Sequence, residues 1–185
     1  MNIKEYSDAD TRDTKNLHKF FETCFNKTMK ETHTFHGGFG NYVTAPGNEN
    51  EYVGLTFFND AVFPEGGQHA IYLSKLAVCP GYQGNGIRKK LMVQGLEKCK
   101  EKGYCVVYLR ISKTKPELGG FYEHIANAMK ISESFETFEK GCEIYKIVLD
   151  EAKAKELDDS LYIEEVKKLP EDFHRKEIPF DDDST

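Results

Sequence analysis

Hydrophobic and polar positions change their period several times along this chain, and each change predicts a different element. Between residues 17 and 25 the apolar residues recur every three or four positions, which indicates one buried face of a helix. A second helix is expected at 87–102, where Gly103 supplies the stop. Short apolar runs bounded by turn residues predict strands at 3–6, 41–44, 52–58, 70–78 and 104–111.

The last third of the chain predicts smaller elements. A short helix is expected at 121–129, followed by a hairpin of 135–138 and 143–149 that turns at Lys140-Gly141. Strands 70–78 and 104–111 flank the helix of 87–102, as parallel neighbours in a sheet do. The order of elements predicts an α+β fold, with a central, mixed, mostly antiparallel twisted sheet flanked by helices.

A chain of 185 residues accommodates one domain with an appendage. We assign residues 1–149 to the domain and residues 150–185 to a charged C-terminal extension. One helix is expected in the extension around 160–169, before Pro170. The acidic run of residues 181–183 lies in a tail that we expect to be mobile. The extension could form a lid, a homodimer contact or no ordered structure.

The composition narrows the classes of partner. Hydrophobic residues make up 39% of the chain, as in globular proteins, and the net charge of −6 argues against nucleic acid as the main partner. No window has the ~18 uninterrupted apolar residues of a membrane span, and residues 1–6 have no apolar signal core. Five scattered cysteines without a Cys-x-x-Cys pair predict neither a disulfide framework nor a metal site, so the expected location is a reducing cytoplasm.

The most informative stretch is the glycine-rich turn between the strand of 70–78 and the helix of 87–102. It reads Cys79-Pro80-Gly81-Tyr82-Gln83-Gly84-Asn85-Gly86. Glycines let a backbone approach a ligand closely, and a helix N-terminus adds about half a positive charge, so the turn predicts a cradle for a phosphate-like anion. A dinucleotide fold fits poorly, because Ile87-Arg88-Lys89 leaves no third glycine.

Residues 76–87 resemble motif A of the GNAT superfamily of N-acetyltransferases, whose loop reads (Arg/Gln)-x-x-Gly-x-(Gly/Ala) after a strand ending in Val-x-Pro. Gln83 and Gly86 fit this loop, whereas Arg88 stands where the family usually has Gly or Ala. Residues 121–124, Phe-Tyr-Glu-His, resemble motif B at the family's distance. The resemblance spans roughly residues 3–149.

The resemblance implies a direct transfer of an acetyl group from acetyl-coenzyme A to an amine. It also implies that the strand before the loop splays from its neighbour, so that its backbone can pair with the pantetheine arm. Tyr122 would protonate the departing thiolate; packing on the core side of a short helix is the alternative role. The other implied cofactor contacts are main-chain groups of Leu76 and Val78 for the pantetheine, and of Gln83, Gly84, Gly86, Ile87 and Arg88 for the pyrophosphate.

The acceptor is less well defined. Residues 72–78 and the run from Leu109 resemble the acetyltransferase domain of N-acetylglutamate synthases, which implies that Lys75 and Arg110 grip substrate carboxylates. Ser112 and Lys115 depart from that pattern. The acceptor would then be a small amine bearing a carboxylate, with a glutamate-like molecule as one example. A solvent-facing charge for Lys75 and a rim salt bridge for Arg110 are the alternatives.

Two other functions stay open. A protein or peptide N-acetyltransferase would use the same fold, and a basic acceptor peptide would suit the negative charge. A non-catalytic acyl-coenzyme A binding module would leave Tyr122 as packing. For the general base, His69, Glu51, Tyr72 and a chain of water molecules are the candidates.

Overall fold

The computed structural model describes residues 2–7, 10–25, 32–33, 38–60, 62–63, 69–132, 135–137, 140–169 and 177–178. The acidic tail expected to be mobile lies outside the described residues. Contacts divide the chain into two compact units. The first unit contains residues 1–57, 75–92 and 174–185, and the second contains residues 58–74 and 93–173.

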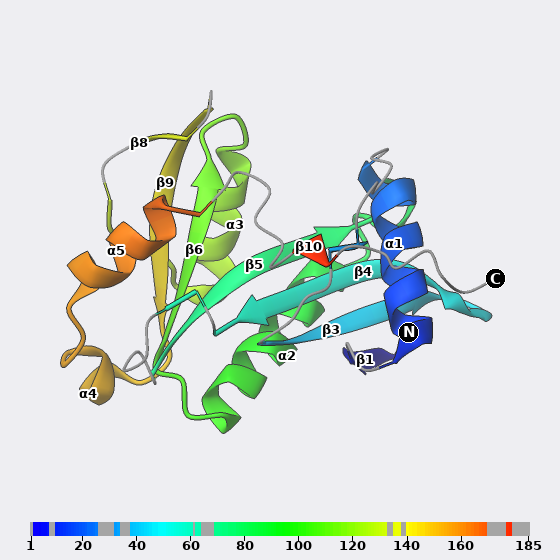
Figure 1. The fold of residues 1–185 in the computed structure, drawn as a ribbon, viewed down its shortest axis with the longest axis horizontal. Coiled ribbons are helices and arrows are strands. Elements are labelled where there is room, and N and C mark those ends of the chain that lie inside the picture. Colours follow the sequence, from blue (N-terminus) through cyan, green and yellow to red (C-terminus); the bar gives the residue numbers. More distant parts are fainter. Residues whose placement is uncertain are drawn as a thin grey trace. The chain divides into compact units, whose positions relative to one another are not determined.

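Five α-helices lie in the described ranges (Figure 1): α1 (Thr11–Phe25), α2 (Ile87–Glu101), α3 (Glu117–Ala126), α4 (Glu151–Ala154) and α5 (Asp159–Lys167). A single 3-10 turn, Pro80–Tyr82, precedes α2. Among the described residues, no helix has the length and apolar character needed to cross a membrane.

Eight strands form the larger sheet, in the order β1-β3-β4-β5-β6-β9-β7, with β8 paired to β9. They are β1 (Ile3–Tyr6), β3 (Gly38–Ala45), β4 (Asn48–Asn59), β5 (Ala70–Val78), β6 (Val106–Ser112), β7 (Met129–Lys130), β8 (Phe135–Thr137) and β9 (Lys140–Val148). β5 and β6 are parallel, whereas β1 with β3 and β6 with β9 are antiparallel. The predicted α+β fold with a mixed, mostly antiparallel sheet is therefore confirmed. A separate two-residue ribbon joins β2 (Thr32–His33) to β10 (Glu177–Ile178).

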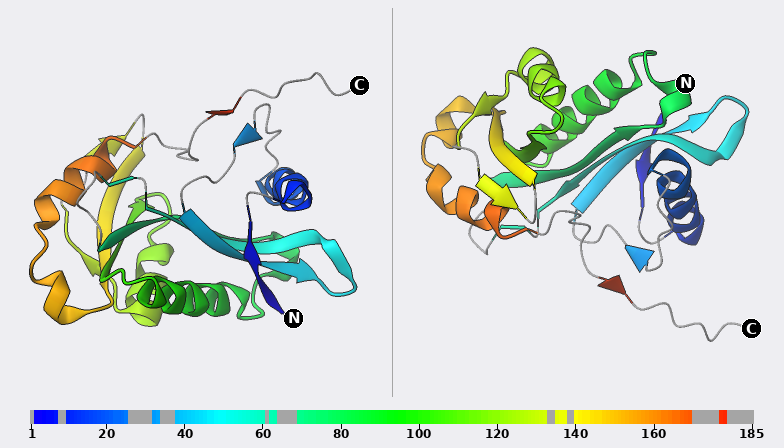
Figure 2. Two further views of the ribbon diagram at one scale, coloured as in Figure 1. Left: turned by 60° about the horizontal axis from the view of Figure 1, so that its bottom comes forward. Right: turned by 90° about the horizontal axis from the view of Figure 1, so that it is seen from above.

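In the first unit, the two faces of the β3–β4 ribbon are covered by different helices (Figure 2). Leu17, Phe20 and Phe21 of α1 pack with Tyr42 and Tyr52 on one face. On the other face Ile87 and Leu91, in the first turns of α2, pack with Val43 and Val53. Neighbouring residues of each strand, such as Tyr42 and Val43, therefore point to opposite faces of the ribbon. This alternation is expected for strands that are covered on both faces.

A buried carboxylate fixes α1 on this ribbon. Asp13, in the first turn of α1, accepts a short hydrogen bond from the Tyr52 hydroxyl of β4 and another from the Ser7 N–H. Tyr52 also stacks on Tyr42, with ring centroids 4.0 Å apart. Burial, together with the neighbouring Asp13 carboxylate, raises the pKa of Tyr52 well above its usual range, so this hydroxyl remains a donor.

In the second unit, α3 and α5 cover opposite faces of the β6–β9 pair (Figure 1). In the antiparallel register Leu109 lies opposite Tyr145, and Tyr108 lies opposite Lys146. Opposed residues share a face, so Tyr145 points with Leu109 towards α3, where its hydroxyl lies against Gly119. The other face carries Tyr108, which stacks on Tyr162 of α5 with centroids 5.0 Å apart.

Three polar contacts attach α5 to the same strand pair. Asp159, at the start of α5, accepts a 2.6 Å hydrogen bond from the Tyr108 hydroxyl. Its carboxylate also forms an ion pair with Lys146 at 2.5 Å. After the end of α5, the carbonyl of Leu169 accepts a 2.6 Å hydrogen bond from Arg110 of β6. Residues 159–169 are therefore built into the core of the second unit rather than placed beside it.

Several element boundaries differ from the sequence prediction. α3 begins at Glu117, four residues before the expected start, because Gly119 and Gly120 are part of the helix. It ends at Ala126, and the capping residue Asn127 adopts a left-handed conformation with φ of 50°, so residues 129–130 form β7 instead of a last helical turn. The short helix α4 was not predicted. The helix stop at Gly103, with φ of 88°, is confirmed.

The close approach of β3 to β4 gives a first prediction. A Cβ atom at Gly40 would lie 2.4 Å from the Thr56 carbonyl oxygen, which is backbone and cannot move aside. We expect Gly40→Ala to lower the free energy of unfolding by roughly 2–3 kcal/mol in urea titrations. Gly120→Ala is the control, because a Cβ there meets nothing within 4 Å and Ala favours a helix. Equal stability of the two variants would contradict this packing argument.

Candidate functional site

The site begins where β5 loses its pairing with β6. Only Ala70, Ile71 and Tyr72 of β5 have register partners in β6. Within the continuous described stretch 69–132, β5 has no register partner in β6 from Leu73 onward. On its other side β5 stays in the sheet beside β4, and the Cys79 N–H donates to the Val53 carbonyl at 2.9 Å.

The alternation of a strand decides which backbone groups point to the open edge of β5. Because the Cys79 N–H points to β4, the main-chain groups of Val78 and Leu76 point to the opposite edge. That edge is the one without a strand partner. The two residues expected to present backbone groups to a ligand therefore point them away from β4.

Beyond β5 the chain makes one tight turn and then a glycine loop. The Tyr82 N–H donates to the Cys79 carbonyl at 2.9 Å, and the Gln83 N–H donates to the Pro80 carbonyl at 3.3 Å. Gly84 and Gly86 then adopt φ of 82° and 71°, a region in which a side chain is strained. The backbone can therefore reverse twice within three residues and enter α2.

The loop presents a set of backbone donors without protein acceptors. The first helical bond of α2 runs from the Lys90 N–H to the Gly86 carbonyl at 3.1 Å. In the described part of the chain, no acceptor is found for the N–H groups of Gly84, Asn85, Gly86, Ile87 and Lys89. A Cβ atom built on Gly81, Gly84 or Gly86 would meet nothing within 4 Å, so the space beside the loop is open. Such an N-terminus suits an anion.

The charges at the start of α2 support the same conclusion. Helices usually carry acidic residues in the first turn, but α2 carries none there. Instead its first residues include Arg88, Lys89 and Lys90, the last two of them exposed. Cations placed at the positive end of a helix are unfavourable unless an anion lies nearby.

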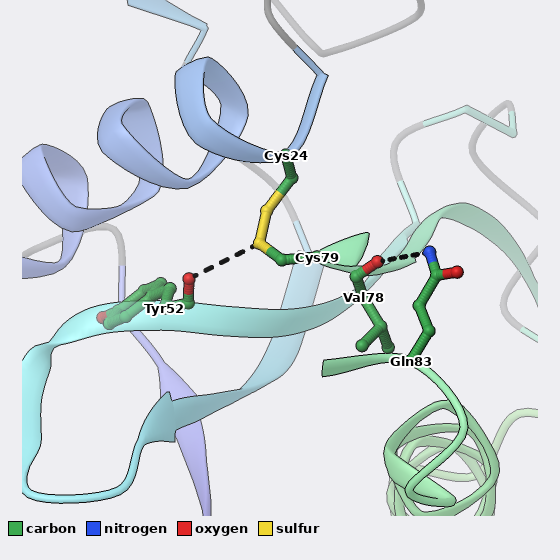
Figure 3. The surroundings of a disulfide bond; sticks show 5 residues. All are labelled: Cys24, Tyr52, Val78, Cys79 and Gln83. Atoms are coloured by element: carbon green, nitrogen blue, oxygen red, sulfur yellow. Dashed lines mark hydrogen bonds between the residues drawn. A yellow bond between two sulfur atoms is a disulfide. The ribbon is translucent and has the colours of Figure 1, made fainter. Parts of the chain in front are cut away.

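The side chain of Gln83 ties the loop back to β5. Its Nε2 donates to the Val78 carbonyl at 3.0 Å (Figure 3). The Asn85 side chain similarly donates to the Tyr82 carbonyl at 3.3 Å. Gln83 therefore uses both its N–H and its amide inside the turn, and it shapes the loop from within.

A disulfide between Cys24 and Cys79 joins α1 to the residue that separates β5 from the loop (Figure 3). The expectation that the scattered cysteines form no disulfide is wrong for this pair. The two residues are 55 positions apart in sequence, yet their Cα atoms are 4.7 Å apart. Packing of α1 over the end of β5 brings them together, which spacing along the chain does not reveal.

Lys75 is the predicted substrate-binding residue in the first unit. Its ammonium lies 5.4 Å from the centre of the Phe21 ring of α1, within the range of a cation–π contact. The side chain is half-buried, so it is held against α1. Its role in gripping a carboxylate stays a prediction.

Tyr122 and Arg110 belong to the second unit. Tyr122 is buried in α3, its ring lies edge-on to Phe121, and its carbonyl accepts the N–H groups of Asn127 and Ala128 that end the helix. Its role as an acid stays a prediction.

Arg110 is half-buried on the face of β6 that α5 covers, and it donates to the Leu169 carbonyl. Its role in gripping a carboxylate also stays a prediction.

The candidates for a general base differ in their surroundings. Burial raises the pKa of the Tyr72 hydroxyl, and the nearby Arg110 guanidinium opposes part of that rise. A phenol with a raised pKa is a poor base near neutral pH. The His69 side chain is exposed, and its carbonyl accepts the N–H groups of Cys105 and Val106. Among the residues that the structure describes, no group of three or more His, Cys, Asp or Glu side chains could hold a metal ion.

A family model described as the acetyltransferase (GNAT) family matches residues 6–126, which is more than half of the chain. The chain belongs to this family. The predicted resemblance to the GNAT superfamily is thereby confirmed. This acetyltransferase has no match among curated proteins at the level of sequence.

Solved structures of GNAT enzymes share the fold of this acetyltransferase. The ribosomal-protein-S18-alanine N-acetyltransferase of Escherichia coli superposes with a TM-score of 0.64 at 12% identity, covering 80% of this chain and 95% of its own. An aminoglycoside 6'-N-acetyltransferase complexed with coenzyme A gives 0.62 at 13% identity, covering 81% and 98%. A GNAT acetyltransferase of Staphylococcus aureus Mu50 gives 0.59 at 21% identity, covering 80% and 99%.

The positive φ angles of the loop give a second prediction. Gly86→Ala should lower the free energy of unfolding of this acetyltransferase by roughly 1–2 kcal/mol, because φ of 71° is strained for any residue with a Cβ atom. Gly81→Ala is the matched control; Gly81 lies in the same turn without a positive φ and with open space around it. Thermal unfolding without ligand measures both. A loss of stability in Gly81→Ala without a loss in Gly86→Ala would contradict the positive φ assigned to Gly86.

Proposed function

We propose that this GNAT protein transfers an acetyl group from acetyl-coenzyme A directly to a primary amine. The observation that carries the proposal is the open edge of β5, followed after one tight turn by the N–H groups of Gly84, Gly86 and Ile87, which find no acceptor in the described part of the chain. A long molecule with a diphosphate at one end and an amide-rich arm at the other matches that sequence of donors and acceptors.

The loop and the end of β5 bind different parts of the cofactor. The N–H groups of Gly84, Gly86, Ile87 and Arg88 hold the diphosphate, and the main-chain groups of Leu76 and Val78 pair with the pantetheine arm. The Gln83 side-chain amide competes with the pantetheine arm for the Val78 carbonyl, because it already donates a hydrogen bond to that oxygen. Gln83 therefore positions the turn and releases or shares this carbonyl when the arm binds.

In a direct transfer no covalent bond forms between the protein and the acetyl group, so the protein residues only position the reactants and move protons. The neutral amine nitrogen attacks the acetyl carbonyl carbon, the carbon–sulfur bond breaks, and the thiolate takes a proton from the Tyr122 hydroxyl. The amine gives up its own proton through a chain of water molecules, one of the candidate routes; Tyr72 is a poor base because burial raises its pKa. Tyr122 then regains a proton from solvent.

For the acceptor we propose a small amine that bears a carboxylate. The proposal follows the resemblance of these strands to the acetyltransferase domain of N-acetylglutamate synthases. Lys75 and Arg110 carry positive charges there, and such charges attract a carboxylate. Solved GNAT structures include enzymes named for a ribosomal protein and for aminoglycosides, so a peptide and a polycationic amine are the alternatives to test.

The decisive experiment measures release of coenzyme A thiol from acetyl-coenzyme A with a panel of amines. The panel contains amino acids, their decarboxylated analogues, an aminoglycoside and an N-terminal peptide. We expect turnover with amines that carry a carboxylate. Binding of acetyl-coenzyme A without turnover on any amine would overturn the proposed reaction, and turnover on the peptide alone would overturn the proposed acceptor class.

The basic residues at the start of α2 give a third prediction. Replacement of both Lys89 and Lys90 by Glu should weaken acetyl-coenzyme A binding about tenfold at low salt, and less at high salt, because the charges are exposed and screened. The control is Lys100→Glu, near the other end of the same helix. Calorimetric titration at two salt concentrations measures the effect. Equal weakening in the control would show that the loop is not the anion site.

The proposed acid gives a fourth prediction. Tyr122→Phe should lower kcat by about 100-fold and leave the affinity for acetyl-coenzyme A nearly unchanged, because only the hydroxyl is lost. Tyr104→Phe serves as the control, since its hydroxyl bonds Asp60 and has no proposed role in transfer. Steady-state kinetics and titration are combined. A loss of affinity at unchanged kcat would contradict the role as an acid.

The carboxylate clamp gives a fifth prediction. Arg110→Ala should raise KM for an amino-acid acceptor by about 10- to 100-fold and leave KM for the decarboxylated analogue unchanged. The paired acceptors separate a lost clamp from a general disturbance, which matters because Arg110 also bonds the Leu169 carbonyl. Equal changes for both acceptors, or none for either, would contradict the clamp.

A further inference from the structure

The disulfide lies at a position that the proposed reaction does not use. Cys79 is the residue between Val78, the last residue of β5, and Pro80, the first residue of the turn. Cys24 lies in the last turn of α1. The bridge therefore fixes the start of the glycine loop to a helix that is held on the ribbon of β3 and β4.

The surroundings of the pair suit a reversible bond. Their Cα distance of 4.7 Å lies within the ordinary range for a disulfide, so both states can form without a large backbone shift. Cys79 is buried, and its sulfur lies 3.9 Å from the Tyr52 carbonyl, whereas Cys24 is half-buried. Cys24 is thus the sulfur that an incoming reagent reaches first.

The other three cysteines do not compete for this role. Cys99, Cys105 and Cys142 are buried and are not disulfide-bonded. Burial raises the pKa of the Cys99 and Cys105 thiols, which disfavours the reactive thiolate. Oxidation is therefore directed to one pair.

We propose that reversible oxidation of Cys24 and Cys79 controls the affinity of the loop for acetyl-coenzyme A, an inference that rests on the proposed cofactor site. In the oxidised state the bridge holds the start of the loop, so less conformational freedom is lost on binding. In the dithiol state the loop keeps the packing of Tyr82 on the cluster of α1 and the bond from Gln83 to Val78, so binding is weakened rather than abolished.

The redox step balances with a low-molecular-weight disulfide such as oxidised glutathione as the oxidant. The Cys24 thiolate attacks one sulfur of that disulfide, forms a mixed disulfide and releases one thiol. The Cys79 thiolate then attacks the Cys24 sulfur, forms the bridge and releases the second thiol. Two electrons and two protons pass from the protein dithiol to the reagent. A reducing compartment would return the protein to the dithiol state.

The test begins with the full chain equilibrated in buffers of defined oxidised-to-reduced glutathione ratio. Alkylation followed by mass spectrometry counts the thiols. We expect three free thiols in the oxidised form, as the structure has, and two more after reduction, with Cys24 and Cys79 as the pair that changes. The oxidised form should also unfold about 5–15 °C higher. Alkylation of every cysteine at all glutathione ratios would overturn the proposal, whatever the fate of the proposed activity.

Calorimetric titration with acetyl-coenzyme A then measures the coupling. This ligand has no free thiol, so it does not reduce the bridge during the titration. We expect Kd to rise about threefold to tenfold in the reduced protein. Cys24→Ala and Cys79→Ala should match the reduced value in both buffers, while Cys142→Ala, in the other unit, should keep the full redox response.

The outcomes separate the two claims. Equal Kd values in the two redox states would overturn the switch and leave the proposed function intact. No binding in either state would overturn the cofactor site, and the switch with it.

Discussion

The early end of the pairing between β5 and β6 is the constraint on which the proposed chemistry depends. Parallel pairing lasts for three residues, and β5 then continues beside β4 alone. A strand edge inside a covered sheet is normally paired, because unpaired backbone groups are costly to bury. Here the main-chain groups of Leu76 and Val78 point away from β4, and the Val78 carbonyl accepts from the Gln83 side chain instead of from a strand. The loop that follows adds the N–H groups of a helix start. The ligand that we propose is extended and has an anionic end, so it matches both sets.

The residues that hold this arrangement act on the backbone rather than on a ligand. Gly84 and Gly86 allow the reversal of the chain, and Gln83 closes the turn onto the Val78 carbonyl. Gly54 lets α2 pack close to β4, because a Cβ there would lie 2.9 Å from Ile87. The position of the helix N-terminus is therefore set by packing behind the loop. This explains how Arg88, at a position where the family usually has a small residue, leaves the cradle of N–H groups intact.

Two contacts join the proposed functional residues to segments that are distant in sequence. The Cys24–Cys79 bridge ties the start of the loop to α1, and Arg110 ties β6 to Leu169, just beyond the end of α5. Each link joins a proposed functional element to a helix distant in sequence.

The sequence by itself determined the glycine loop and the strand and helix on either side of it. Periodicity placed β5, α2 and its stop at Gly103, and the spacing of Gln83 and Gly86 indicated the family, because these signals are local. Only the tertiary structure decided what lies far apart in sequence: the three-residue limit of the β5–β6 pairing, the meeting of Cys24 with Cys79, and the hydrogen bond from Arg110 to Leu169. Such contacts depend on how helices pack on the sheet. The helical start of α3 also lay beyond sequence reasoning. Gly119 disfavours a helix by propensity, but its missing side chain leaves room for the Tyr145 hydroxyl, which only the tertiary structure shows.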